Sequence, residues 1–130
     1  MPLETEGFWV MAKISAHGKI VFQFLASNGT LVAYCEDKVT LYRSPYLGGW
    51  KIRGKIKADR TVEQAAGNTR RIYCEKGQTW RLNVKRMPSV RTLEKWASEG
   101  VCETVTGEIV EPDGIGRDGA PSWLRALCMI

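Results

Sequence analysis

The sequence predicts an α+β fold built on a mostly antiparallel β-sheet, a meander of about six strands on which one amphipathic helix and a short C-terminal helix pack. Three observations predict it. Apolar side chains recur at every second position over most of residues 7–87, turn residues separate these stretches, and a helical spacing begins only near residue 89. Because 130 residues suit one core, we expect a single small domain over residues 1–130, with a helix, a hairpin and a C-terminal clasp over residues 88–130.

The N-terminal part of the chain predicts antiparallel strands joined by short turns. Asn28 and Gly29 form the strongest hairpin signal, because both central residues of a type I′ turn need a positive φ, which Asn, Asp and Gly adopt at low cost. On the strand before this turn, Ile20, Phe22 and Phe24 are two residues apart and are expected on one face. The strands expected here cover residues 8–15, 19–27, 30–37 and 39–44.

The middle of the chain predicts a basic strand, a short helical segment and a hairpin. Along residues 51–58 the basic side chains recur with a period of two, so a strand here places them on one face and the isoleucines on the other. The stretch TVEQAAG predicts one or two helical turns that end at Gly67. Residues 69–76 and 79–86 are then expected to form the two arms of a hairpin around Gly77.

From Ser89 onward the spacing of apolar residues becomes helical. Ser89 suits the N-cap position, and Gly100 stands where a left-handed residue commonly ends a helix. The apolar stripe of this helix is Val90, Leu93, Trp96 and Ala97. A short hairpin around Thr106 and Gly107 follows. Ser122 then opens a last helix, SWLRALCMI, which has no polar face and is expected to be buried as a clasp over the protein's own sheet or over that of a second copy.

The composition indicates a cytoplasmic protein without a metal or cofactor. No apolar run approaches the length of a membrane span, and the first residues are acidic where a signal peptide is basic. The chain has one histidine, His17, and its cysteines lie too far apart for the paired ligands of a zinc site. Reduced, mostly buried thiols are expected at Cys35, Cys74, Cys102 and Cys128.

The sequence contains none of the common local motifs that mark catalytic residues. The chain lacks a glycine-rich dinucleotide motif, a Walker loop, a G-x-S-x-G elbow and an H-E-x-x-H pair. A site assembled from distant residues leaves no such motif, so enzymatic activity stays open. A protein without enzymatic activity is the better expectation.

The net charge of +5 is distributed unevenly along the chain. The first fifty residues hold four basic and four acidic side chains, residues 51–100 hold thirteen and five, and residues 101–130 hold two and five. Cations at this density repel one another unless an anionic partner matches them. Nucleic acid is the usual partner of basic strand faces, because binding releases condensed counterions. The alternative is a solvated face whose lysines deter edge aggregation.

These charges predict a nucleic-acid-binding module. The candidate contacts are Lys51, Arg53, Lys55, Lys57, Arg70, Arg71, Arg81, Lys85 and Arg86, with Trp50 and Tyr73 as aromatic side chains for base stacking. Trp80 shares a face with apolar residues and is expected in the core instead. The alternative function is a protein-interaction or self-assembling module, a homo-oligomer whose interface residues are Trp123, Leu124, Leu127 and Ile130.

The stretch SVRTLEKWASEG, with the hairpin after it, resembles the recognition helix and wing of MerR- and excisionase-type winged helix-turn-helix proteins. The resemblance implies that Arg91 and Lys95 face DNA while Leu93 and Trp96 anchor the helix. Such proteins also need a first helix a few residues upstream, where this sequence predicts a strand.

Two further stretches resemble known families. FQFLASNGTLVAYCED is similar to a hairpin of the YegP-like domains, whose function is not established, although Cys35 replaces a serine and Pro45 interrupts the helix expected next. The tail IVEPDGIGRDGAPSWLRALCMI resembles that of small bacterial and phage proteins of unknown function, with Cys128 in place of a glycine. The second resemblance implies an origin in a phage or another mobile element.

Overall fold

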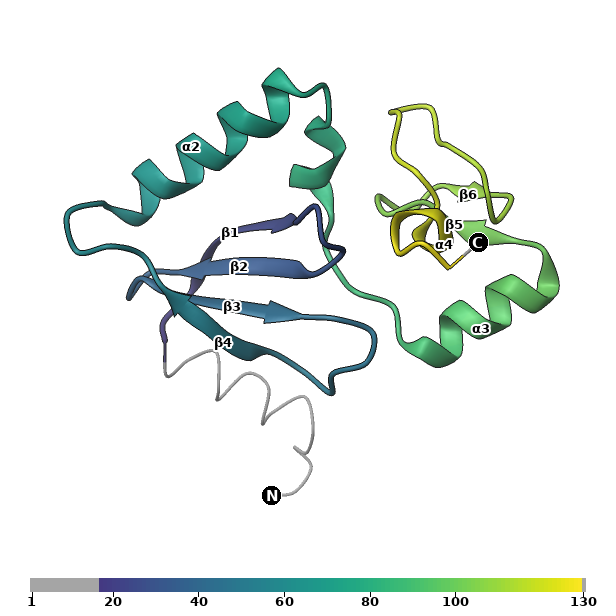
Figure 1. Cartoon of the computed structure of the whole chain (residues 1–130), viewed down its shortest axis with the longest axis horizontal. Helices are drawn as coiled ribbons and strands as arrows, with labels where there is room; N and C mark the ends of the chain where they lie inside the picture. The colour runs from purple at the N-terminus through teal and green to yellow at the C-terminus, as the bar shows by residue number, and fades with distance from the viewer. Residues whose placement is uncertain (1–16, 130) are drawn as a thin grey trace.

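A computed structural model describes residues 17–129 and has an α+β architecture (Figure 1). Its elements are β1 (Ile20–Leu25), β2 (Leu31–Cys35), β3 (Val39–Arg43), β4 (Lys51–Lys55), α2 (Val62–Glu75), the 3₁₀ helix η1 (Thr79–Asn83), α3 (Val90–Glu99), β5 (Cys102–Glu103), β6 (Ile109–Val110) and α4 (Trp123–Ala126). The predicted α+β class is confirmed. Strands β1 to β4 form an antiparallel meander of four strands rather than about six, and β5 and β6 form a separate two-stranded sheet. The strand expected over residues 8–15 lies outside the described residues.

The first hairpin closes at the predicted residues, but its turn is not of type I′. Gly29 has a φ of 88°, whereas Asn28 keeps a negative φ. The Gly29 amide donates to the carbonyl of Ala26 at 3.0 Å, and the Asn28 side chain accepts from the Thr30 amide at 3.1 Å. This is a type I turn followed by a left-handed glycine, the common three-residue hairpin loop.

A β-bulge in β1 corrects the expected face of Ile20. The register between β1 and β2 shifts between Ile20 and Phe22, so one extra residue reverses the alternation of side chains. Phe22 and Phe24 pack beneath α2 as one cluster, while Ile20 packs with Ala33 and Leu41 on the other face.

Helix α2 replaces the short helix and the first hairpin arm that the sequence predicted. Thr61 starts it with a capping box: its hydroxyl accepts from the Gln64 amide at 3.0 Å, and its own amide donates to the Gln64 side chain at 2.8 Å. The helix continues through Gly67, and Gly77, with a φ of 70°, follows its end. One helical stripe carries the buried residues Val62, Ala65, Ala66 and Tyr73.

The second predicted hairpin arm is not a strand either. Residues Thr79–Asn83 form the 3₁₀ helix η1. Trp80 is buried as expected, together with Val84. Leu82, however, packs in a different cluster from these two residues, because a helical turn does not place alternate residues on one face.

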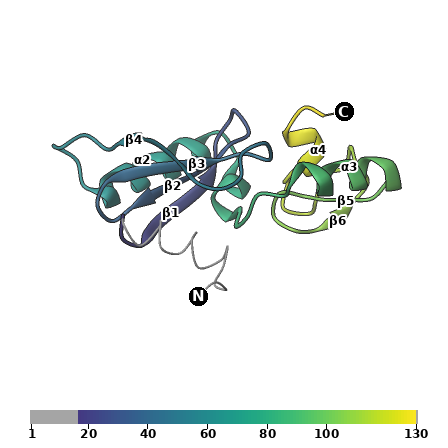
Figure 2. The same cartoon turned by 90° about the horizontal axis from the view of Figure 1, so that it is seen from below.

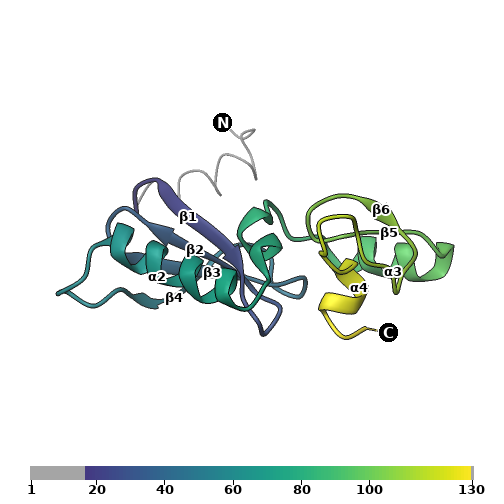
Figure 3. The same ribbon diagram turned by 90° about the horizontal axis from the view of Figure 1, so that it is seen from above.

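Helix α2 lies along one face of the four-stranded sheet (Figures 1 and 3). Its apolar stripe packs on an aromatic layer from β1 and β2 in which neighbouring ring centroids are 5.6 Å apart. These rings are Phe22, Phe24 and Tyr34. Burial of this layer fixes α2 against the sheet.

The C-terminal elements lie together at one end of the sheet (Figures 1 and 2). Helix α3 has the predicted bounds and caps: the Ser89 hydroxyl accepts from the Thr92 amide at 3.2 Å, and Gly100 ends the helix with a φ of 74°. It was expected to pack on the sheet, but it contacts α4 and β5 beyond the end of the sheet, and the helix that lies on the sheet is α2 (Figure 1). Leu93 is fully buried, but Ala97 is exposed. The buried side of the helix therefore does not include Ala97, which the predicted apolar stripe contained. The hairpin around Gly107 is confirmed as β5 and β6, with two residues in each strand.

The terminal clasp packs on its own chain. Trp123 and Leu124 are 3% and 0% exposed, and they join a core cluster with Leu25 and Leu31 at the tip of the first hairpin. Arg125 and the two residues after Leu127 are exposed, so burial on all sides holds only for the start of the segment. The predicted interface residue Ile130 lies outside the described part of the chain.

A buried hydroxyl fixes the position of α4. Ser122 is fully buried; its Oγ donates to the carbonyl of Pro112 and accepts from the Arg125 amide at 3.0 Å. A β-bridge also joins Ser122 to Thr104 beside the two-stranded sheet. These contacts position the tail. Across residues 17–129 we find no helix with the length and apolar character to cross a membrane.

Candidate nucleic-acid interface

The structure separates the basic candidates into groups that do not share one face. In the sheet order β1-β2-β3-β4, strands β1 and β4 are the two outer strands. Residues 51–57 comprise β4 and the two residues after it, whereas residues 81–86 belong to η1 and the segment after it, and η1 packs against β1. The two basic stretches therefore lie at opposite edges of the sheet and do not form one continuous basic face.

Four cations surround one hollow between the end of β4 and the start of α2. This basic cleft has a volume of about 460 Å³ and is bordered by Arg53, Lys55, Lys57 and Arg60. Tyr34 and the buried Thr40 line it from the sheet. The cleft thus brings four cationic residues around one hollow.

A second β-bulge determines how β4 presents its charges. The pairing passes from Thr40 with Gly54 to Leu41 with Ile52, which leaves Arg53 unpaired. Lys51 pairs with Tyr42 and Lys55 with Val39, and these two partners lie on opposite faces of β3. The basic side chains of β4 are therefore not all on one face, as strict alternation predicted. Ile52 is 65% exposed at the sheet edge.

The charges of the basic cleft have no carboxylate partner in residues 17–129. The ion pairs found there join Arg86 to Glu103 at 3.9 Å and His17 to Asp37 at 3.2 Å. The cleft also adjoins the N-terminus of α2, since Arg60 directly precedes the cap residue Thr61. The positive end of the helix dipole adds to the attraction for an anion there.

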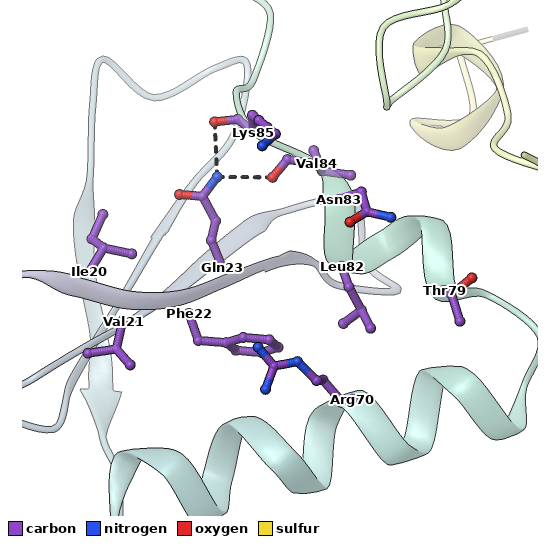
Figure 4. Close-up of a pocket in the computed structure, with 10 residues that line it drawn as sticks. All are labelled: Ile20, Val21, Phe22, Gln23, Arg70, Thr79, Leu82, Asn83, Val84 and Lys85. Atoms are coloured by element: carbon purple, nitrogen blue, oxygen red, sulfur yellow. Dashed lines mark hydrogen bonds between the residues drawn. The ribbon is translucent and has the colours of Figure 1, made fainter.

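A second hollow, of about 570 Å³, lies between β1, α2 and η1 (Figure 4). Arg70 lies on the α2 side with its guanidinium 4.8 Å from the ring centre of Phe22. On the other side of β1, the Gln23 side chain donates to the carbonyls of Val84 and Lys85 at 3.0 and 2.9 Å. Of the predicted contacts, this hollow holds only Arg70 and Lys85, on different sides of a strand.

Arg81 has a structural role. Its guanidinium donates to the carbonyls of Leu25 and Ala26 at 3.1 and 3.0 Å and lies 4.5 Å from the ring centre of Trp80. Burial lowers the pKa of Arg81 below its ordinary value. A side chain with these contacts holds η1 on the first hairpin and is not free to bind phosphate.

The predicted stacking aromatics are both engaged within the protein. Tyr73 is 8% exposed and packs 5.8 Å from the ring of Phe24, so it is a core residue. Trp50 is half-buried against two core clusters, and the guanidinium of Arg43 lies 5.6 Å from its ring centre. Neither presents a free ring face comparable with that of Tyr46, which is 72% exposed.

Sequence reasoning missed Arg60 and Tyr46. Arg60 lies outside the period-two pattern of β4, and only the turn in which its amide donates to the Lys57 carbonyl at 3.0 Å brings it to the cleft. Tyr46 lies between Pro45 and two glycines, a turn-rich setting that favours exposure and could have marked it.

Helix α3 and the hairpin after it follow each other as the winged-helix resemblance implies. Arg91 and Lys95 are exposed, but Glu94 and Glu99 on the same helix balance their charge. The following segment is acidic, with Glu103, Glu108, Glu111, Asp113 and Asp118 against two arginines. The element just upstream is the five-residue η1. The electrostatics of this part favour DNA less than those of the basic cleft.

Of the four free cysteines, Cys35 and Cys102 are buried, whereas Cys74 and Cys128 are exposed, so the expectation of mostly buried thiols holds for only two of them. No group of three or more potential metal ligands occurs within residues 17–129. Burial, then the charges of Asp37 and Glu36, raise the pKa of the Cys35 thiol, which makes it unreactive.

No protein-family model, no curated protein and no solved structure matches this chain. The function therefore has to be argued from the site itself.

Proposed function

We propose that this protein is a non-enzymatic, cytoplasmic nucleic-acid-binding module that holds the phosphate backbone in its basic cleft. The observation that carries the proposal is the convergence of Arg53, Lys55, Lys57 and Arg60 on one hollow without a carboxylate partner in the described residues. Cations in this arrangement repel one another in the free protein, and an anionic polymer relieves that repulsion. The resemblance of the tail to phage proteins supports an accessory role in a mobile element.

Phosphate binding predicts a measurable dependence on salt. If the four cations each neutralise one phosphate, the logarithm of the affinity falls with the logarithm of the salt concentration with a slope of about −3 for a single strand and about −3.6 for a duplex. Fluorescence anisotropy with labelled single-stranded and duplex oligonucleotides at several salt concentrations measures this slope. Absence of binding at low salt, or binding indifferent to salt, would contradict the proposal.

Charge reversal tests whether the basic cleft is the site. The triple variant Arg53→Glu, Lys57→Glu, Arg60→Glu should lose binding at least a hundredfold, because each reversal removes an attraction and adds a repulsion. A matched control, Arg91→Glu, Lys95→Glu, Arg117→Glu, changes the net charge equally outside the cleft. The control should weaken binding only a few-fold, and circular dichroism checks that both variants fold. An equal loss in the two variants would show nonspecific attraction and overturn the assignment of the cleft.

The alternative function, self-assembly through the C-terminal helix, receives less support. Its central candidate residues, Trp123 and Leu124, are buried in the core of their own chain. Leu127 is also partly covered there. A subunit contact through these side chains would require the clasp to leave that core.

A further inference from the structure

Strand β4 connects two features that suit different parts of a nucleotide. At its end lies the basic cleft, and before its start lies the loop that carries Tyr46. Tyr46 is the most exposed large apolar side chain of the described residues, and Ile52, on β4 between the two ends, is also largely exposed. At about 3.3 Å per residue, Lys51 and Lys55 are about 13 Å apart, a length that a few unpaired nucleotides can follow.

Contacts within the protein hold the loop before β4, which carries Tyr46. Tyr46 borders a hollow of about 320 Å³ together with Arg43 and Met87. The guanidinium of Arg43 lies over Trp50, and its Nε is buried without a hydrogen-bond partner among residues 17–129. A turn in which the Leu47 amide donates to the Ser44 carbonyl at 3.2 Å shapes the loop. Tyr46 and Arg43 thus border the same hollow.

The edge of β4 between these ends is open in the described structure. β4 is an outer strand of the sheet, and no other described strand pairs with its free side. Lys51, Arg53 and Lys55 are exposed along it. An extended polyanion that lies along this edge passes Lys51, Arg53 and Lys55, of which Lys51 and Lys55 lie on opposite faces of the sheet.

We propose that the ligand of this module is single-stranded nucleic acid that runs along β4, with one base stacked on Tyr46 and its phosphates in the basic cleft. The inference rests on the proposed function and names its substrate class. Stacking on an exposed ring requires an unpaired base, because the bases of a duplex already stack on one another inside the helix. A duplex would use the cations of β4 but leave Tyr46 without a partner.

The test compares Tyr46→Ala with Tyr46→Phe, which keeps the ring, on single-stranded DNA and RNA oligonucleotides of one sequence and on the matching duplex. Tyr46→Ala should bind a single strand about tenfold more weakly, and Tyr46→Phe should bind like the wild type. The salt slope should stay the same in both variants, because no phosphate contact is lost. Duplex affinity should not change. Loss on either DNA or RNA single strands supports the inference and identifies the polymer.

The outcomes separate this inference from the proposed function. If Tyr46→Ala binds single strands like the wild type while the triple charge reversal abolishes binding, the inference is overturned and the basic cleft remains the site. Preference of the wild type for duplex would overturn it in the same way. If the wild type binds no oligonucleotide at low salt, both the inference and the proposed function are wrong.

Discussion

Two turns of the sheet share a backbone path but differ in the residue that adopts a left-handed conformation. Gly29 and Lys38 have φ values of 88° and 74°, and each donates its amide to the carbonyl three residues earlier at 3.0 Å. In each turn the preceding side chain, Asn28 or Asp37, accepts from the amide two residues further on. A left-handed conformation costs an ordinary L-residue about 1–2 kcal/mol, so the second turn is strained and the first is not.

Lys38→Gly should therefore raise the free energy of unfolding by about 0.5–1 kcal/mol. Release of the strain outweighs the greater freedom of glycine in the unfolded chain. The substitution also removes the solvent-exposed hydrogen bond that the Lys38 ammonium donates to the Ala58 carbonyl. Urea unfolding at neutral pH measures the change. The reverse experiment, Gly29→Ala, should destabilise by about 1 kcal/mol or more, because a Cβ there meets Leu127 at 3.0 Å. A less stable Lys38→Gly would refute the strain argument.

Substitution of Arg81 tests whether this basic residue stabilises the fold or binds the ligand. Arg81→Lys keeps the charge but loses the planar fork that reaches two carbonyls and covers Trp80. We expect a loss of about 1–3 kcal/mol in the free energy of unfolding, measured by thermal or urea unfolding. Affinity for an oligonucleotide should not change at temperatures where the variant is folded. If Arg81→Lys has normal stability but binds the oligonucleotide more weakly, Arg81 contacts the nucleic acid and the structural assignment is wrong.

At the scale of elements, the sequence predicts those structures whose signals are local. The strands β1 to β4 and the helix α3 follow from turn residues and caps such as Ser89 and Gly100. Helix α2 was missed because Gly67 and the β-branched and aromatic residues after it indicated a turn and a strand. The capping box at Thr61 and an apolar stripe that continues past Gly67 outweigh these weak propensities. The two β-bulges have no signal in the sequence, and they decide the faces of Ile20 and Arg53.

The glycine inside α2 offers a direct test of that helix. Gly67 is exposed, and a Cβ there meets nothing within 4 Å. Gly67→Ala should raise the free energy of unfolding by about 0.5–1 kcal/mol, since alanine loses less backbone entropy in a helix. Gly77→Ala is the matched control: it also has open space, but its φ of 70° makes it destabilising. If residue 67 were in a turn, as the sequence suggested, Gly67→Ala would not stabilise the protein.

Asp118 makes the C-terminal hairpin sensitive to acid. Its carboxylate accepts from the Thr106 hydroxyl at 2.7 Å and from the Ala120 amide at 3.0 Å. The Thr106 bond, followed by the Ala120 bond, lowers the pKa of Asp118 below its ordinary value of 3.8. The ionised form therefore stabilises the fold above that value, and this contribution is lost as the pH falls through the lower pKa of the folded state.

Asp118→Asn should consequently be less stable than the wild type at neutral pH. The difference in the free energy of unfolding should shrink as the pH falls below 3.8, because the wild-type carboxyl then becomes neutral as well. Urea unfolding of both proteins across the acid range measures it. A difference that stays constant with pH would mean that the ionised carboxylate does not support the hairpin.

At the scale of the whole molecule, the sequence located the excess of positive charge but not its arrangement. Residues 51–100 carry the charge, as the composition shows. The topology then sends residues 51–57 to one edge of the sheet and residues 81–86 to the other, since α2 crosses the sheet between them. Which cations meet at one cleft depends on this crossing, which no spacing along the chain encodes. The burial of Tyr73 follows from the same crossing, because Tyr73 lies on the stripe of α2 that packs on the sheet.

The clasp decides whether the chain unfolds as one unit. Leu124 is fully buried in a cluster that combines Leu25 from the sheet, Trp80 from η1 and Leu93 from α3. Leu124→Ala should lower the free energy of unfolding by about 2–5 kcal/mol, the cost of the lost burial and of the cavity. Because the cluster joins the sheet to the C-terminal elements, tryptophan fluorescence and far-ultraviolet circular dichroism should report one common transition in the variant. Arg125→Ala, on the exposed side of the same helix, should shift the transition little. Separate transitions, with the sheet still folded after the C-terminal elements have melted, would show instead that the clasp closes only its own end of the molecule.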